Sequence, residues 1–182
     1  MNNNIPDAIN VEGNEEQKEK YIRPLCEGKA IASIAFTEPA TGTDPRAIIT
    51  RAELDGDFWV INGSKRFISM GAEDGPCLFF AKTGDRVSAF ILEKNVEGYS
   101  VSKKWELMGL AAQGVVDLRL ENVRILKGNL DGSQGDGYAI LRRSIAGSKI
   151  AICARTVGSA QAALDEAIKY AKERTRRGVP IA

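Results

Sequence analysis

The stretch from Ala30 to about Leu126 alternates short apolar runs with turn signals, and this pattern constrains the fold more than any other part of the chain. Glycine-containing pairs such as Asp55-Gly56 and Asn62-Gly63 separate the runs, as expected for tight turns between strands. Many short strands joined by tight turns predict an antiparallel β-sandwich or a barrel-like domain. The expected strands are Ala30–Phe36, Ile48–Leu54, Phe58–Ile61, Arg66–Ser69, Leu78–Lys82, Ala89–Leu92, Tyr99–Lys103 and Val115–Leu120.

A short helix is expected before the β-rich stretch. Asn14 can cap it, and the two glutamates that follow favour the positive end of the helix dipole. Gly28 is expected to end this helix near Glu27. Residues 1–13 are polar and are expected to be irregular.

A long helix is expected after the β-rich stretch. Gly128 to Gly137 form a glycine-rich linker, and from about Tyr138 to Arg174 apolar residues recur every three or four positions. The whole chain is therefore predicted to be α+β, with a β-domain between a short N-terminal helix and a long C-terminal helix. A stripe of small residues on the long helix predicts close helix neighbours and self-association, with exchange of the helix between copies as one route.

Charge and hydropathy exclude several classes of partner. Lys and Arg number 25 against 24 Asp and Glu, so the chain lacks the basic field that binds nucleic acid. No apolar run approaches the roughly 20 residues that span a bilayer, so no membrane partner is expected. Met1–Asn4 has neither the basic nor the apolar region of a signal peptide. We expect a cytoplasmic location in a bacterium, or the mitochondrial matrix in a eukaryote.

The absence of histidine restricts the chemistry. Without His, the chain cannot form Ser-His or Cys-His nucleophile pairs or a histidine metal site, and no metal is predicted. The three cysteines, Cys26, Cys77 and Cys153, are widely spaced in apolar surroundings and form no CxxC pair. Reduced thiols are the better interpretation.

Two segments could form a polar binding site. In Phe36–Asp44, a strand opens into a loop where Pro39 fixes φ, Gly42 allows a positive φ, and threonine hydroxyls lie near the backbone. Such a loop can hold an anion or the edge of a polar ring, although an ordinary turn fits the same residues. In Ile61–Gly71, Phe67 and Ser69 would share one strand face and could pack a flat ring and bond its edge. The alternative is a core Phe beside a surface Ser.

The two segments closely resemble the flavin-contacting signatures of the acyl-CoA dehydrogenases, and a third motif near the C-terminus resembles the same family. The resemblance extends from about Gly13 to Ala182 and covers the middle of the family. The motifs are Thr37-Glu38-Pro39-x-x-Gly42-Thr43-Asp44, Ile61-Asn62-Gly63-x-Lys65-x-Phe67-Ile68-Ser69-x-Gly71, and Ala160 to Ala171 followed by Arg174.

The resemblance implies an FAD-dependent oxidoreductase that removes hydrogen across the Cα–Cβ bond of an acyl-CoA thioester. It also implies an electron-transfer flavoprotein as partner and a homo-oligomer. By the same resemblance, residues 1–28 hold the last helix of a truncated N-terminal helical domain. Residues 29–128 form the middle β-domain, and residues 129–182 hold a linker and the first long helix of a truncated C-terminal domain.

The resemblance also assigns site residues. Phe67 stands where the family usually has Trp, and Ser69 replaces a common Thr. Thr43, where Ser is usual, is expected to contact the cofactor pyrophosphate or the pantetheine of the substrate, and Lys149, where Arg is usual, to contact the substrate. The residues expected to bind the cofactor are Phe36, Thr37, Gly42, Thr43, Phe67, Ile68, Ser69 and Arg174.

No residue of the chain is predicted to be the catalytic base. In most of the family the base is a Glu that would lie beyond Ala182, and in a minority it occupies the position of Ser148. A serine without histidine is not a base at neutral pH, so the 182 residues alone are expected to be inactive. Two alternatives remain open at this point: a non-catalytic β-module that acts through protein contacts, and an acyl-CoA oxidase.

Overall fold

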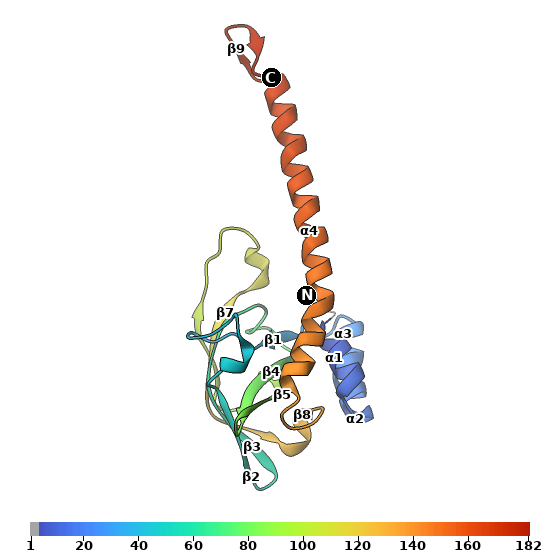
Figure 1. Ribbon diagram of the computed structural model, residues 1–182, viewed down its shortest axis with the longest axis vertical. Coiled ribbons are helices and arrows are strands. Elements are labelled where there is room, and N and C mark those ends of the chain that lie inside the picture. The colour runs from blue at the N-terminus through green and yellow to red at the C-terminus, as the bar shows by residue number, and fades with distance from the viewer. Residues whose placement is uncertain (1–3) are drawn as a thin grey trace. The chain divides into compact units, whose positions relative to one another are not determined.

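The computed structural model describes residues 4–182, which divide into two compact units (Figure 1). The first unit ends at Ser144 and contains the β-domain and the N-terminal helices. The second unit is Ile145–Ala182. Helix α4 (Gly137–Glu173) begins in the first unit and continues into the second.

Eight strands of the first unit form one hydrogen-bonded sheet in the order β6-β7-β3-β2-β4-β5-β8, with β1 added beside β4. Within the described residues the pairings are antiparallel, except that β1 and β2 each run parallel to β4. The strands are β1 (Ser33–Ala35), β2 (Arg51–Asp55), β3 (Phe58–Ile68), β4 (Pro76–Thr83), β5 (Arg86–Glu93), β6 (Tyr99–Lys104), β7 (Val116–Leu126) and β8 (Leu130–Asp131).

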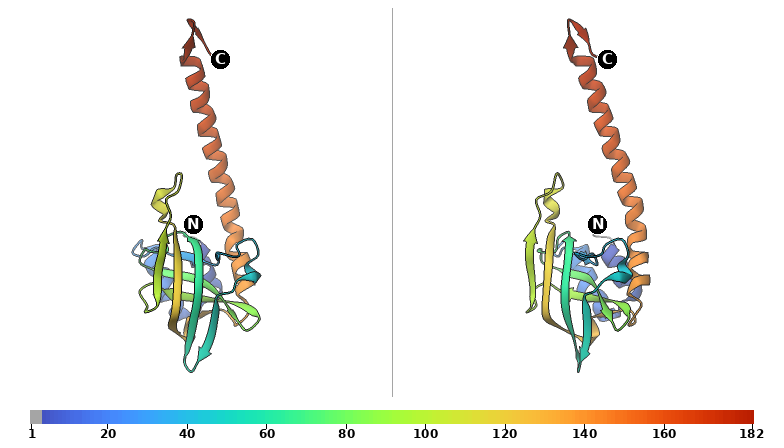
Figure 2. Two further views of the ribbon diagram at one scale, coloured as in Figure 1. Left: turned by 90° about the vertical axis from the view of Figure 1, so that its left-hand side faces the viewer. Right: turned by 60° about the vertical axis from the view of Figure 1, so that its left-hand side comes forward.

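The sheet folds into two layers where β2 meets β4. The two strands share one residue pair, Arg51 with Lys82. Figure 2 shows β4 and β5, in green, crossing behind β3 and β7. Trp59 on β3 meets Phe90 on β5 edge to face, with ring centroids 5.4 Å apart, and both belong to the main hydrophobic core. The α+β fold class and the sandwich-like β-domain are therefore confirmed.

The Asn62-Gly63 pair is not a turn, which corrects the sequence prediction. Phe58–Ile61 and Arg66–Ser69, expected as two strands, are parts of the single strand β3, and the pairing with β7 shifts register between Ile61 and Gly63. Gly63 has a φ of 154°, and a Cβ there would lie 2.4 Å from Thr50 Oγ1. A glycine inside a strand often marks a bulge or a close approach rather than a turn.

The N-terminal helical region is longer than the sequence suggested. Asn4–Glu12 forms helix α1, so the expectation of irregular structure was wrong for these residues, and it otherwise concerns residues 1–3, outside the described part. Ile5, Ala8 and Ile9 are buried, because their spacing places them on one helix face. The predicted cap is confirmed: Asn14 and Gln17 form a reciprocal capping box. The following turns are α2 (Glu15–Gln17), a π-helical turn (Lys18–Ile22) and α3 (Arg23–Cys26).

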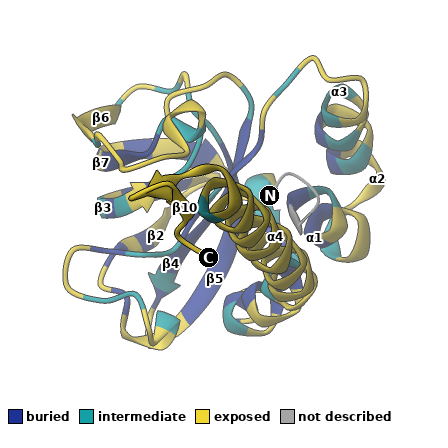
Figure 3. Cartoon of the chain, turned by 90° about the horizontal axis from the view of Figure 1, so that it is seen from above, coloured by how far each residue is buried: buried dark blue, intermediate teal, exposed yellow. Residues whose placement is uncertain are grey.

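Helix α4 confirms the expected long helix. Its first turns bury Ile140, Leu141 and Ser144 against the first unit. Along Ile145–Glu173 the side chains are largely exposed, as the yellow colour of α4 shows in Figure 3. The helix ends before a short hairpin of β9 (Thr175–Arg176) and β10 (Val179–Pro180). The remaining short elements are the 3₁₀ turns Pro45–Ala47, Ala111–Gln113 and Lys127–Asn129.

The helices of residues 4–182 are either too short or too polar to cross a lipid bilayer. Within the same residues, no cluster of three or more acidic or cysteine side chains is arranged to hold a metal ion.

Replacing Gly63 with alanine should destabilise the first unit strongly. The added methyl group meets the Thr50 side chain, and the backbone has a φ that suits glycine, so we expect a loss of about 3 kcal/mol. Gly56 is the matched control, because its φ is also positive but a Cβ there meets nothing within 4 Å. Gly56→Ala should cost about 1 kcal/mol. Urea denaturation measures both, and equal losses would contradict the close approach at Gly63.

Asp131 should make stability depend on pH. The residue is fully buried on β8, and among the described residues neither carboxylate oxygen has a hydrogen-bond partner. Burial, aided by the negative charge of Glu12 and opposed by Arg143, raises the pKa of Asp131 to about 6 from an ordinary value of 3.8.

Between about pH 4 and 6 the folded state keeps a proton that the unfolded state has lost, so stability falls as pH rises through this window. We expect the unfolding free energy to be about 1 kcal/mol larger at pH 5 than at pH 7 through this group. Asp131→Asn should remove that difference in urea titrations at the two pH values. Asp136→Asn, at an exposed carboxylate, should keep it.

Candidate functional site

The two predicted site segments lie side by side. Arg66 N on β3 donates to Thr37 O at 2.8 Å, and Lys65 Nζ approaches Phe36 O at 3.4 Å. The loop after β1 is thereby attached to the end of β3 that carries Phe67. The predicted convergence of the two segments is present in the structure.

A buried ion pair fixes this attachment. Lys65 Nζ lies 2.8 Å from Glu38 Oε1, and the two side chains are 0% and 1% exposed. Glu38 also accepts hydrogen bonds from the backbone N–H groups of Ile49 and Thr50, at 2.6 Å and 3.0 Å. One carboxylate therefore joins the loop, β3 and the chain entering β2.

Both members of the pair are ionised at neutral pH. Burial lowers the pKa of Lys65 to about 8, and attraction to Glu38 limits the fall. Burial raises the pKa of Glu38, but Lys65 and the two backbone donors outweigh it and hold the pKa below the ordinary value of 4.5. The site therefore rests on a charged pair that is closed off from solvent.

The loop itself is a tight turn followed by a capped 3₁₀ turn. Glu38 and Thr41 exchange backbone hydrogen bonds across Pro39 and Ala40. Asp44 then accepts from the Arg46 backbone and pairs with the Arg46 guanidinium at 2.9 Å. Thr43, between these two turns, is exposed.

Gly42 owes its place to close packing, not to a positive φ. It is not among the residues with positive φ, and a Cβ there would lie 3.2 Å from the Thr37 methyl group. The sequence interpretation of Gly42 as a left-handed position is therefore corrected. A larger residue would push against Thr37, one of the predicted cofactor contacts.

Phe67 projects from a distorted part of β3. Lys65 pairs with Leu118 of β7 and Ile68 pairs with Val116, so two residues of β3 stand opposite Asp117 alone. Phe67 has a φ of 59°, in the left-handed region that non-glycine residues seldom adopt. The residue is 51% exposed, which excludes the alternative of a core Phe.

The Phe67 ring does not stand alone. Trp105 packs against it with ring centroids 4.9 Å apart and planes inclined by 51°. Lys103 Nζ lies 3.5 Å from the centre of the Trp105 ring. The two rings form an aromatic surface at the end of β3 beside the loop.

Ser69 lies in a turn after β3, so the expected strand alternation does not relate it to Phe67. Lys94 holds this turn: its ammonium donates to Met70 O at 2.8 Å and Glu73 O at 2.7 Å. Tyr99 Oη adds a bond to Gly71 O at 2.7 Å. The side chain of Ile68 is buried in the core, so any contact of Ile68 with a cofactor would use its backbone.

The other predicted residues belong to the second unit. Lys149 lies on α4 and is exposed. Arg174 directly follows α4, is exposed, and bonds through its backbone to Tyr170 and Ile181. Their assignments stay predictions.

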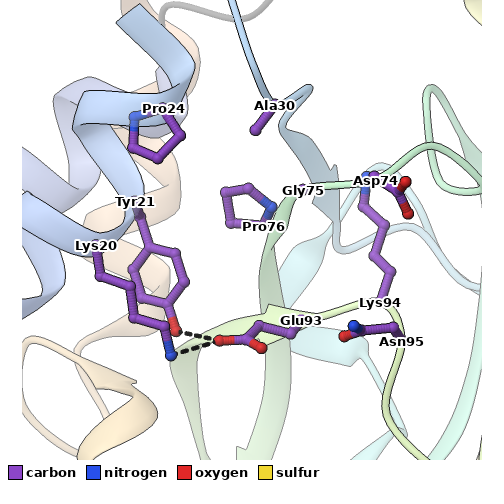
Figure 4. A pocket seen from close by; sticks show the side chains of 10 residues that line it. All are labelled: Lys20, Tyr21, Pro24, Ala30, Asp74, Gly75, Pro76, Glu93, Lys94 and Asn95. Atoms are coloured by element: carbon purple, nitrogen blue, oxygen red, sulfur yellow. Dashed lines mark hydrogen bonds and ion pairs between the residues drawn. The ribbon is translucent and has the colours of Figure 1, made fainter. Parts of the chain in front are cut away.

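One cavity of the first unit lies apart from the predicted residues. It has a volume of about 400 Å³ and lies between the N-terminal helices and the start of β4 (Figure 4). Two of its charged groups form an ion pair, Lys20 with Glu93 at 2.6 Å, and Tyr21 Oη donates to the same carboxylate at 3.1 Å.

A second cavity, of about 320 Å³, lies next to the predicted loop. Arg46, Arg86 and Tyr138 line it, and the Arg46 guanidinium lies over the Tyr138 ring at 5.4 Å. Both guanidinium groups also contact a carboxylate, Asp44 or Asp136. Two cations beside an aromatic ring could hold a phosphorylated, aromatic end of a ligand.

Sequence reasoning missed Trp105, Asp117 and Lys94. Each acts on the Phe67–Gly71 segment from a strand or loop at least 20 residues further along the chain. No local pattern in the sequence marks such pairings. The one hint in the sequence was that Trp105 is aromatic and could therefore pack against Phe67.

The fold and the site define a β-domain in which two aromatic rings, inclined to each other by 51°, lie at the end of a strand that is bonded to a polar loop, and this domain is joined to a long helix. Residues 33–123 match the acyl-CoA dehydrogenase middle domain, and residues 135–182 match the C-terminal domain of the same family. The chain therefore belongs to the acyl-CoA dehydrogenase family.

Individual relatives agree with this assignment. The chain is 40% identical over 176 residues to a short-chain specific acyl-CoA dehydrogenase of Clostridium acetobutylicum, covering 93% of this chain and 46% of that protein. It is 38% identical over 175 residues to a subunit of the caffeyl-CoA reductase–Etf complex of Acetobacterium woodii, with the same shares covered.

A solved structure agrees as well. A glutaryl-CoA dehydrogenase of Mycobacterium smegmatis in complex with FADH2 superposes with a TM-score of 0.89 at 27% identity, over 97% of this chain and 46% of that one. The chain thus spans about half the length of the relatives it matches.

Removing the Lys65 charge should destabilise the site severely. Lys65→Met leaves the Glu38 carboxylate buried without a cation, and we expect a loss of about 3–5 kcal/mol in urea denaturation. The double variant Lys65→Met, Glu38→Gln should be more stable than Lys65→Met alone. Lys29→Met, at an exposed lysine, should change little. A loss below about 1 kcal/mol for Lys65→Met would contradict a charged buried pair.

Proposed function

We propose that this chain is the flavin-contacting part of an FAD-dependent oxidoreductase that acts on the CH–CH group of acyl-CoA thioesters. One observation carries the proposal: the polar loop Thr37–Thr43 is bonded to the residue next to the exposed Phe67, since Arg66 N donates to Thr37 O at 2.8 Å. Family membership supplies the reaction class. The substrate of the short-chain specific relative supports an acyl-CoA.

The residues of the site fit FAD. The exposed Phe67 ring and the half-buried Trp105 ring offer apolar surface against which an isoalloxazine could stack. The loop offers backbone and hydroxyl groups of Phe36, Thr37 and Thr43 to the polar parts of the cofactor, and Ser69 offers a hydroxyl from the turn after β3. When bound, FAD would supply the acceptor for the hydride that leaves the substrate β-carbon. Arg174 would contact the FAD of a neighbouring copy.

Two regions would hold the acyl-CoA. Thr43 and Lys149 are assigned to the substrate by position in the family motifs. The cavity beside the loop supports a place for the nucleotide end, because Arg46 and Arg86 supply positive charge next to Tyr138. Charge-assisted bonds from guanidinium groups suit phosphate oxygens.

We propose further that these 182 residues do not oxidise acyl-CoA alone. The two carboxylates that bond to the site segments are both engaged: Glu38 binds Lys65 and two backbone amides, and Asp117 accepts from Arg66 and Phe67. Both carboxylates have a pKa below the ordinary value and are poor proton acceptors. Ser148 stands where a minority of the family has the base, and a hydroxyl is no substitute at neutral pH.

Partners follow at family level. The relative in the caffeyl-CoA reductase–Etf complex supports an electron-transfer flavoprotein as partner. Exposed apolar side chains on α4, among them Ile150, Val157 and Leu164, support self-association as a homo-oligomer, with helix exchange as one route. A cytoplasmic location, or the mitochondrial matrix for a eukaryotic source, stays a prediction.

FAD titration tests the proposal. We expect the purified chain to bind FAD, with a change in flavin absorbance, and Phe67→Ala to weaken binding about tenfold because the ring platform is lost. Phe58→Ala, at a partly exposed ring on the same strand, is the matched control and should bind normally. No binding by the parent chain would favour the non-catalytic module. Turnover of butyryl-CoA by the chain would overturn the proposed inactivity, and reoxidation of the reduced flavin by oxygen would favour the oxidase.

A further inference from the structure

Asp117 occupies the point where two irregularities of the sheet meet. On one side, Arg66 and Phe67 of β3 stand opposite Asp117 alone. On the other side, β6 shifts register between Val101 and Lys103, and Lys103 pairs with Asp117. Such bulges redirect side chains and are frequent beside functional sites.

The Asp117 carboxylate satisfies the groups that the bulge on β3 frees. Its Oδ1 accepts from Phe67 N at 3.1 Å, and its Oδ2 accepts from Arg66 Nε at 3.2 Å. A left-handed φ at a non-glycine residue persists only where the surroundings impose it.

The same carboxylate fixes the second ring. Trp105 Nε1 donates to Asp117 Oδ1 at 2.7 Å, the shortest of the three bonds. Asp117 is 7% exposed, so water competes little for these bonds. Burial would raise the pKa of Asp117, but the bonds from Trp105, Phe67 and Arg66 hold it below its ordinary value, so the carboxylate is charged at neutral pH.

We propose that Asp117 is a positioning residue that sets the shape of the aromatic surface. It holds Phe67 in its left-handed conformation and brings Trp105 against it, so that the two rings meet 4.9 Å apart. The role of this surface towards FAD rests on the proposed function. The role of Asp117 towards the two rings does not.

The test compares Asp117→Leu with Glu121→Gln. Leu keeps roughly the size of Asp117 but accepts no hydrogen bond, so Phe67 N, Arg66 Nε and Trp105 Nε1 all lose their acceptor. Glu121 lies on the same strand and is exposed, so its substitution leaves the two rings unchanged. Both are made in a Trp59→Phe background, where Trp105 is the single tryptophan.

Three readouts separate positioning from general stability. In Asp117→Leu we expect acrylamide to quench Trp105 more strongly, the Phe67 amide to exchange hydrogen about tenfold faster, and FAD to bind about tenfold more weakly. Glu121→Gln should match the parent in all three.

A separate experiment tests the strain at Phe67. In a Phe67→Gly background the shift in urea midpoint caused by Asp117→Ala should shrink, because glycine adopts this φ without strain.

Each outcome supports or overturns one part of the proposal. Unchanged Trp105 quenching and unchanged Phe67 exchange in Asp117→Leu would overturn the inference. Altered rings with normal FAD affinity would overturn the role of this surface towards the cofactor. If the parent chain binds no FAD, the proposed function fails, while quenching and exchange still support or refute the role of Asp117.

Discussion

The ion pair between Lys65 and Glu38 is the interaction on which the site depends. It lies in the interior, at 2.8 Å, and it joins a loop to a strand that begins 20 residues later in the chain. Removing two charges from water costs free energy that their attraction only partly returns. The main effect of the pair is therefore to fix the position of the loop on β3 rather than to add stability. Any shift of the loop Thr37–Thr43 away from β3 would leave a buried charge without its partner.

Strand β3 is the second constraint, because it departs from regular pairing twice. At Gly63 the missing side chain lets the strand approach Thr50, and the register on β7 shifts. Opposite Asp117 the strand carries an extra residue and turns Phe67 outward. Bulges bend a strand and increase its twist. A strand of regular alternation would bury Phe67 and Lys65 on one face, since the two are separated by two positions. The irregularity is what allows an interior lysine and an exposed ring so close together.

The sequence predicted the elements that depend on local pattern. The strand-rich region, the capped N-terminal helix and the long helix α4 follow from periodicity and from capping at Asn14. The motifs around Gly42 and Phe67 brought the two site segments into consideration. Three features escaped prediction for physical reasons. Asn62-Gly63 resembles a hairpin turn, and only the contact with Thr50 shows why the glycine is there. Gly42 serves packing rather than φ. The bonds from Asp117 and Lys94 to the Phe67–Gly71 segment cross 20 to 50 residues, and no short window of sequence contains them.

Four charged side chains of the first unit show which groups of the site could take part in a reaction. Glu38, Lys65, Lys94 and Asp117 are each held by ion pairs or backbone bonds, so none is free to transfer a proton. What the site leaves available is a pair of rings, a turn with a hydroxyl, and a loop of backbone and threonine groups. Such groups can contact a planar ligand and form hydrogen bonds with it, but they take no part in acid–base exchange. A proton transfer at this site would therefore need a group outside these segments.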